Sequence, residues 1–112
     1  MAEMLIQNDP DYLERKWGSY FQFTKNENST VNVLNVNKGG ILTKRFHYNY
    51  SVHWFLISGR CWFTKGIICG NLMPGENVTI EKHENHSLEA LDDSIVLEIC
   101  KGYYDEKDIV RL

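Results

Sequence analysis

The chain lacks three features that would each have indicated a class of function. No apolar run approaches the roughly 20 residues of a membrane-spanning helix, and the first residues lack the basic flank and long apolar core of a secretion signal. No basic cluster is longer than Lys44-Arg45, and the net charge is -3, which argues against nucleic-acid binding through phosphate neutralisation. We therefore expect a cytoplasmic protein with neither a membrane nor a nucleic-acid partner.

Cysteine is scarce and forms no paired motif. Cys61, Cys69 and Cys100 are odd in number, and no two of them have CxxC spacing. Cys61 and Cys100 each lie in an apolar run, where a thiol acts as a small hydrophobic side chain. Three reduced thiols are the expected state, and a zinc site or a disulfide remains an alternative.

Helical periodicity is also absent, and short segments typical of strands replace it. Residues 30–36 alternate in hydrophobicity, and residues 53–57 form a nearly continuous apolar strand. Turns containing Gly or Pro separate the segments. Further strands are expected over residues 19–24, 41–48, 60–64, 77–80, 86–91 and 94–100.

One domain is expected for 112 residues. Many short strands with regular turns predict an all-β, antiparallel sandwich or barrel that encloses room for one small ligand. Residues 8–16 are polar and rich in turn formers, so we interpret residues 1–13 as an N-terminal arm, not a strand, and residues 14–112 as the domain. The tail, residues 105–112, is interpreted as a short helix or an added edge strand.

Motifs along the chain carry a resemblance to a known family. Residues 15–20 read Arg-Lys-Trp-Gly-Ser-Tyr and residues 108–111 read Asp-Ile-Val-Arg, with Arg45-Phe46-His47, His53-Trp54 and His86 between them. Over residues 14–111 the chain resembles the cupin domain of type II mannose-6-phosphate isomerases. That domain usually forms the C-terminal part of bifunctional enzymes that also act as mannose-1-phosphate guanylyltransferases, and the nucleotidyltransferase half is absent from this sequence.

The resemblance implies a cupin-type jelly-roll β-barrel, often a homodimer formed by strand exchange at the sheet edges. It also implies interconversion of mannose 6-phosphate and fructose 6-phosphate. That chemistry needs a divalent metal to polarise a carbonyl group and a base to move a proton between neighbouring carbons.

The cupin metal motif is incomplete in this chain. The family pattern has one His, a second His two residues later, a carboxylate, and a further His in a second motif. His47 and His86 match the first and last ligands, whereas Asn49 takes the place of the second His and Val52 that of the Glu. Two imidazoles make a poor site, even with Asn49 as a possible third ligand, because zinc generally takes three or four protein ligands.

Three interpretations of His47 and His86 remain open. They could hold a weakly bound Zn, Mn, Ni or Fe ion, bind a sugar or water without metal, or be satisfied core side chains. Strand alternation places His53 on the opposite face from His47, and His83 lies in a charged loop that we expect to be exposed.

Aromatic and charged residues near these histidines complete the candidate site. Tyr48 and Tyr50, with Asn49, are candidate substrate-binding residues at the pocket rim, whereas Trp54 and Trp62 are expected in the core. Arg45 is a candidate phosphate ligand because its guanidinium fork matches phosphate oxygens; Lys44 is expected to be solvated.

The candidate catalytic residues are Glu98 and Arg111. Glu98 could act as a base if it points inward, and Glu89 is a weaker candidate. Glu98 is the more interesting of the two because it interrupts an apolar run, and a buried carboxylate must be paired or protonated.

Three functions follow from these observations. The first is a stand-alone cupin that binds a sugar or sugar phosphate at a degenerate metal site, in nucleotide-sugar or polysaccharide metabolism. The second is an active metal-dependent isomerase with a rebuilt site. The third is a structural dimer without a small ligand, which an apolar, fully packed lumen would favour.

Overall fold

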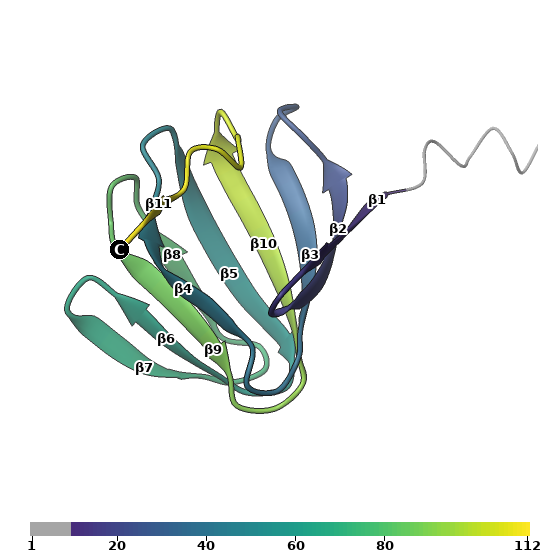
Figure 1. Ribbon diagram of the computed structural model, residues 1–112, viewed down its shortest axis with the longest axis vertical. Helices are drawn as coiled ribbons and strands as arrows, with labels where there is room; N and C mark the ends of the chain where they lie inside the picture. The colour runs from purple at the N-terminus through teal and green to yellow at the C-terminus, as the bar shows by residue number, and fades with distance from the viewer. Residues whose placement is uncertain (1–9) are drawn as a thin grey trace, which may run out of the picture.

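The computed structural model describes residues 10–112, which form two antiparallel sheets (Figure 1). In spatial order, the six-stranded sheet contains β1 (Asp11–Arg15), β2 (Gly18–Thr24), β3 (Thr30–Val36), β10 (Ser94–Gly102), β5 (Tyr50–Ser58) and β8 (Asn77–Ile80). The five-stranded sheet contains β11 (Val110–Arg111), β4 (Ile41–Phe46), β9 (His86–Ala90), β6 (Cys61–Lys65) and β7 (Ile68–Leu72). The all-β jelly-roll prediction is confirmed.

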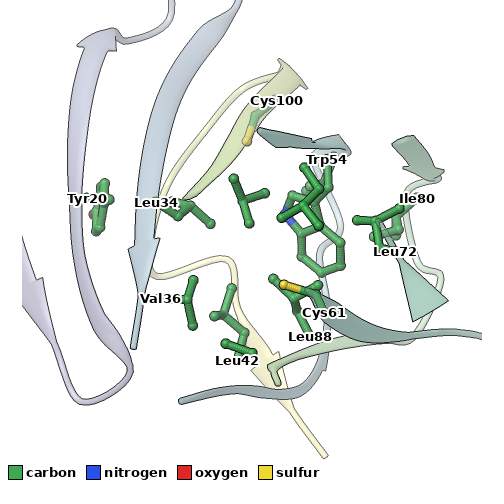
Figure 2. Close-up of a cluster of buried hydrophobic side chains, with 14 of the residues drawn as sticks. Tyr20, Leu34, Val36, Leu42, Trp54, Cys61, Leu72, Ile80, Leu88 and Cys100 are labelled. Atoms are coloured by element: carbon green, nitrogen blue, oxygen red, sulfur yellow. The ribbon is translucent and has the colours of Figure 1, made fainter. Parts of the chain in front are cut away.

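The core lies between the two sheets and is built from alternate residues of each strand. On β3 and β5 every second side chain is buried, as the period of two along a strand requires. Figure 2 shows Leu34 and Val36 of one sheet meeting Leu42, Cys61 and Leu88 of the other, with Trp54 in the middle of the cluster. Within residues 10–112 there is no helix long and apolar enough to cross a membrane.

Two predictions about single elements were wrong. Residues 11–15 are strand β1, which pairs with β2 along its whole length; its residues are mostly exposed on both faces, so the segment lacks the hydrophobic pattern of a strand. The boundary between residues 13 and 14 falls inside β1, and residues 1–9 of the expected arm lie outside the described residues. Trp62 is 38% exposed, because it lies on the outer face of β6.

The chain terminus and the cysteines agree with the predictions. Of the two interpretations of the tail, the edge strand is confirmed, because β11 pairs with β4. Cys61, Cys69 and Cys100 are all free, and the first and last of them are buried in the core. Burial raises the pKa of both of these thiols, so they serve as packing side chains.

Candidate functional site

A cavity opens between the sheets, next to the segment that joins β4 to β5. Its volume open to water is about 70 Å³, enough for about five water molecules, or roughly 150 Å³ of liquid volume. The polar side chains in its lining include Arg45, His47, Tyr50, His86 and Glu98, so the lumen is not the apolar, packed interior of a purely structural barrel.

His47 and His86 meet inside this cavity, as the sequence predicted. Their ring centroids lie 4.9 Å apart. Tyr50 stacks on His47 at 4.2 Å, and Trp54 meets His86 edge-on at 5.5 Å. These aromatic contacts hold both imidazole rings in fixed orientations.

The backbone fixes the tautomer of both histidines. His47 Nδ1 lies 2.8 Å from the Asp108 carbonyl oxygen, and His86 Nδ1 lies 2.9 Å from that of Glu84. Because a carbonyl oxygen can only accept, each Nδ1 must carry the proton. Each Nε2 therefore keeps a lone pair that can accept a hydroxyl proton or bind a metal.

Both imidazoles are neutral at physiological pH. Burial lowers the pKa of His86 to about 4, and burial also lowers the pKa of His47. The His47 ring and the Arg45 guanidinium contribute to this lowered pKa of His86, after burial. The pair therefore presents two neutral acceptors.

The residues present do not fit a cupin metal centre. Within residues 10–112 no group of three or more His, Cys, Asp or Glu side chains is arranged to hold a metal ion. Val52, at the family's carboxylate position, is buried and apolar in the cavity wall. Asn49, the possible third ligand, is exposed and is not part of the lining, because its backbone N–H is held by Asp108 Oδ2 at 2.8 Å.

Glu98 points into the cavity, and a network of buried polar groups holds it there. Its Oε1 accepts a hydrogen bond from Asn32 Nδ2 at 2.9 Å, and its Oε2 accepts one from Trp54 Nε1 at 2.9 Å. Asn32 Oδ1 in turn accepts from Gln22 Nε2 at 3.0 Å. The carboxylate is therefore hydrogen-bonded, as its position in an apolar run requires, and it lines the same cavity as the two histidines. Glu89 alternates with the buried Leu88 and Ala90 and does not point inward.

Two arginines enter the cavity side by side. Arg45 of β4 and Arg111 of β11 are direct partners in the strand register, and both line the cavity. Burial lowers the pKa of Arg45, and Arg111 lowers it further, although an arginine stays charged. Among residues 10–112 neither guanidinium forms a salt bridge with a carboxylate, whereas Arg15 at the same cavity pairs with Glu106 at 2.6 Å. Arg45 Nε donates a hydrogen bond to the Thr43 carbonyl oxygen at 2.8 Å, which leaves its charge without a carboxylate partner. The two guanidinium groups therefore suit an anion.

The C-terminal tail holds one wall of the site. Asp108 accepts hydrogen bonds from the backbone N–H groups of Tyr48 and Asn49, at 3.0 and 2.8 Å, while its carbonyl oxygen holds His47. In Figure 1 the tail crosses from the end of β10 to β4 on the other sheet. The Asp-Ile-Val-Arg motif therefore supplies both a support for His47 and the second arginine.

The remaining predicted residues divide between the cavity and the surface. Tyr50 is buried in the lining, whereas Tyr48 is 51% exposed and packs on His83 outside it. His53 points away from the cavity and contacts Asn77 Oδ1 at 2.9 Å, and His83 is exposed, as expected for both. Lys44 is exposed, as expected.

Sequence reasoning missed Asn32, Tyr104, Glu106 and the role of Asp108. No local signal marked Asn32, because its pairing with Glu98 depends on the register between β3 and β10. The signal for Asp108 was its place in the closing motif.

Comparison with known proteins identifies the family. Residues 7–112 match the family described as mannose-6-phosphate isomerase C-terminal. The chain belongs to this family. The cupin domain is also 28% identical over 120 residues to mannose-1-phosphate guanylyltransferase 2 of Escherichia coli O157:H7. The alignment covers 99% of this chain and 25% of that protein. The chain thus spans about a quarter of the curated relative's length.

Solved structures share the fold of this cupin domain. KdgF from Halomonas sp. superposes with a TM-score of 0.79 at 17% identity, covering 87% of this chain and 90% of KdgF. A variant of oxalate decarboxylase from Bacillus subtilis superposes with a TM-score of 0.82 at 16% identity, covering 93% of this chain and 30% of that one. At such identities the likeness establishes the jelly-roll fold and no more.

Proposed function

We propose that this cupin domain binds a sugar phosphate in the barrel cavity without requiring a metal ion. The observation that carries the proposal is the pair of guanidinium groups of Arg45 and Arg111, which lie beside two neutral imidazole acceptors and form no salt bridge among residues 10–112. A phosphate group would bind between the arginines, since each guanidinium can donate two parallel hydrogen bonds to it. Family membership supports a hexose phosphate as the ligand.

The other cavity groups suit the hydroxyls of a sugar ring. Nε2 of His47 and Nε2 of His86 can each accept a hydroxyl proton, and so can the Glu98 carboxylate. Tyr50 and Trp54 add aromatic surface against the sugar ring carbons. In this proposal Arg111 is a phosphate-binding residue, and Glu98 orients a hydroxyl.

The test is a titration followed by NMR on chelator-treated protein with labelled histidines. Mannose 6-phosphate should shift the ring signals of His47 and His86, with His53 and His83 unchanged as internal controls. Mannose should bind at least about tenfold more weakly, because it lacks the charge-assisted bonds to the arginines. Equal affinity for the two, or no shift with either, would remove the proposal.

Metal-dependent isomerisation is the second candidate. In its favour, each imidazole donates its Nδ1–H to a backbone carbonyl oxygen, as metal-binding histidines commonly do, and this leaves Nε2 available to a metal. The discriminating measurements are metal content per chain, in protein purified without chelator, and turnover of mannose 6-phosphate. About one equivalent of metal, lost in His47→Ala or His86→Ala and accompanied by turnover, would replace our proposal with this one.

A further inference from the structure

A groove borders the cavity on the inner side of β1 and β2, beside the tail that follows β10. Its volume open to water is about 470 Å³, which lies within the usual range for small-molecule sites. Tyr20, Tyr104 and Glu106 line both the groove and the cavity, so the two spaces meet at these side chains. The groups proposed to bind the sugar phosphate line the cavity and not the groove.

The buried amide of Gln22 presents an acceptor to this groove. Because the Glu98 carboxylate accepts hydrogen bonds, the Asn32 atom that faces it must be the donor Nδ2. Asn32 Oδ1 then faces Gln22, which must donate to it through Nε2, at 3.0 Å. Gln22 Oε1, the other end of the amide, has no hydrogen-bond partner among residues 10–112. No buried polar side-chain atom in this part of the chain is left unpaired, so this oxygen reaches the groove that Gln22 lines.

Other polar groups surround this acceptor. Gln22 is only 9% exposed, and a nearly buried oxygen without a partner indicates a place for a hydrogen-bond donor. Asp11 is the direct cross-strand partner of Gln22, so its carboxylate lies on the same face of the sheet. The other charged side chains of the lining are Lys25, Asp105, Glu106 and Lys107. Such a mixture of acceptors and donors matches hydroxyl groups, because a hydroxyl donates one hydrogen bond and accepts others.

Charge differs between the cavity and the groove. The cavity is lined by three guanidinium groups and two carboxylates, whereas the groove is lined by two ammonium groups and three carboxylates. At the boundary Arg15 pairs with Glu106 at 2.6 Å. A phosphate group is therefore attracted to the cavity, and the part of a ligand that enters the groove is uncharged.

The groove suits a sugar ring better than a nucleobase. A base binds best on an open aromatic plane, but Tyr20 and Tyr104 are only 4% and 7% exposed and present little free ring surface. The ring of Tyr12 packs on Phe21, its cross-strand partner, at 5.0 Å. A hydroxylated ring instead uses the acceptors and donors that the groove provides.

We infer that the groove is a second sugar subsite, so that the ligand of this domain is a phosphorylated disaccharide. The phosphorylated ring occupies the cavity and a neutral ring occupies the groove, with the glycosidic bond between Tyr20 and Tyr104, where the two spaces meet. Gln22 Oε1 and the Asp11 carboxylate accept hydroxyl protons of the neutral ring. This inference rests on the proposed sugar-phosphate site in the cavity.

The first experiment is calorimetric titration of the full chain with ligands that differ only in the second ring. The reference is methyl α-mannoside 6-phosphate, and the test ligands are α-1,2-, α-1,3- and α-1,6-mannobiose, each phosphorylated at O6 of the non-reducing mannose. At least one mannobiose phosphate should bind about tenfold or more tightly than the reference, because the second ring adds hydrogen bonds.

Two carboxylate variants of β1 locate the source of this gain. Asp11→Ala should reduce the gain to less than about threefold, because it removes an acceptor from the groove. Glu14→Ala is the matched control, since Glu14 is an exposed carboxylate of the same strand that does not line the groove. This variant should keep the full gain.

The second experiment places the two rings by NOEs between the bound ligand and leucine methyl groups of the wild-type protein. The neutral ring should contact Leu13, which lines the groove and not the cavity. The phosphorylated ring should contact Leu34 or Leu42, which line the cavity and not the groove.

Failure of the groove and failure of the cavity give different results. Binding of methyl α-mannoside 6-phosphate without any gain from a second ring, or a second ring without NOEs to Leu13, would overturn the groove subsite alone. Absence of binding by every phosphorylated mannoside would overturn the proposed function and this inference with it. A gain found only for GDP-mannose over mannose 1-phosphate would place a nucleoside in the groove and overturn the second sugar ring.

Discussion

Arg45 and Arg111 face each other directly across the β4–β11 pair, and both reach the same cavity. Like charges at opposed positions destabilise a sheet by roughly 0.2–1 kcal/mol. Within residues 10–112 no carboxylate forms a salt bridge with either one. An anion bound between the two would remove the repulsion, and this relationship favours a phosphorylated ligand over a neutral sugar.

The first prediction concerns this pair. Arg111→Gln should leave the stability of the unliganded protein unchanged or raise it by up to about 0.5 kcal/mol at low salt, because the repulsion is lost. The same change should abolish stabilisation by inorganic phosphate, which raises the melting temperature of a protein that binds it in the folded state. Thermal unfolding with and without phosphate, at constant ionic strength, measures both effects.

Arg60→Gln is the control for that experiment. Arg60 pairs with Asp92 at 3.3 Å, away from the cavity, so phosphate should stabilise this variant as it does the wild type. Equal phosphate stabilisation of Arg111→Gln and the wild type would show that the arginine pair is not an anion site.

The second prediction is a loss of stability in mild acid. Because burial lowers the folded-state pKa of His86 to about 4, the unfolded chain, with a His pKa of about 6.5, binds the proton first. The contribution of neutral His86 to the free energy of unfolding is therefore fully present above about pH 6.5 and is lost as the pH falls toward 4. Between pH 7 and pH 5 the loss of unfolding free energy due to His86 should be roughly 2 kcal/mol. The pKa of His47 is also lowered, so His47 adds to the loss.

Urea denaturation of chelator-treated protein at the two pH values provides the measurement. His86→Gln should lose distinctly less stability over this range than the wild type, since it lacks the titrating group. If the two proteins lose stability in parallel, the low pKa of His86 is not the cause.

The third prediction compares two glutamates on neighbouring parts of the barrel. Glu98→Gln should destabilise the protein by about 1–3 kcal/mol, because an amide cannot accept hydrogen bonds from both Asn32 and Trp54 with its two terminal atoms. Glu89→Gln, on the outward side of β9, should change the free energy of unfolding by less than about 0.5 kcal/mol. Chemical denaturation of both variants at pH 7 tests the difference, and equal effects would contradict the network.

The fourth prediction concerns the support that Asp108 gives to the segment carrying His47. Asp108→Ala removes the acceptors for the Tyr48 and Asn49 N–H groups, so these two amides should exchange with solvent at least about tenfold faster. Asp108→Asn keeps one side-chain oxygen and should have an intermediate effect. Unchanged exchange in Asp108→Ala would show that the tail does not hold this segment.

Local patterns were enough to predict much of the fold. Strands β3 and β8 match the predicted ranges residue for residue. The alternation within each strand and the turn residues beside it are both visible in the local sequence. Strand β1 escaped prediction because its residues are mostly exposed on both faces, and only its pairing with β2 makes it a strand. Trp62 was misplaced because aromatic content alone does not give the phase of a strand.

A site residue was predictable where its polarity differed from that of its neighbours in the sequence. Glu98 stood out as a charge in an apolar run, and the structure places it inward. Asn32 did not stand out, because both faces of β3 carry apolar side chains and the sequence does not say which one is buried. The opposition of Arg45 and Arg111 depends on pairing between two residues 66 positions apart in the chain, which no local pattern encodes.

The most direct test of the account is calorimetric titration of chelator-treated, metal-free protein with mannose 6-phosphate. We predict saturable binding with one site per chain, weakened at least about tenfold in Arg45→Gln. Absence of heat from the metal-free protein, with binding restored by a divalent metal, would contradict a metal-independent sugar-phosphate site.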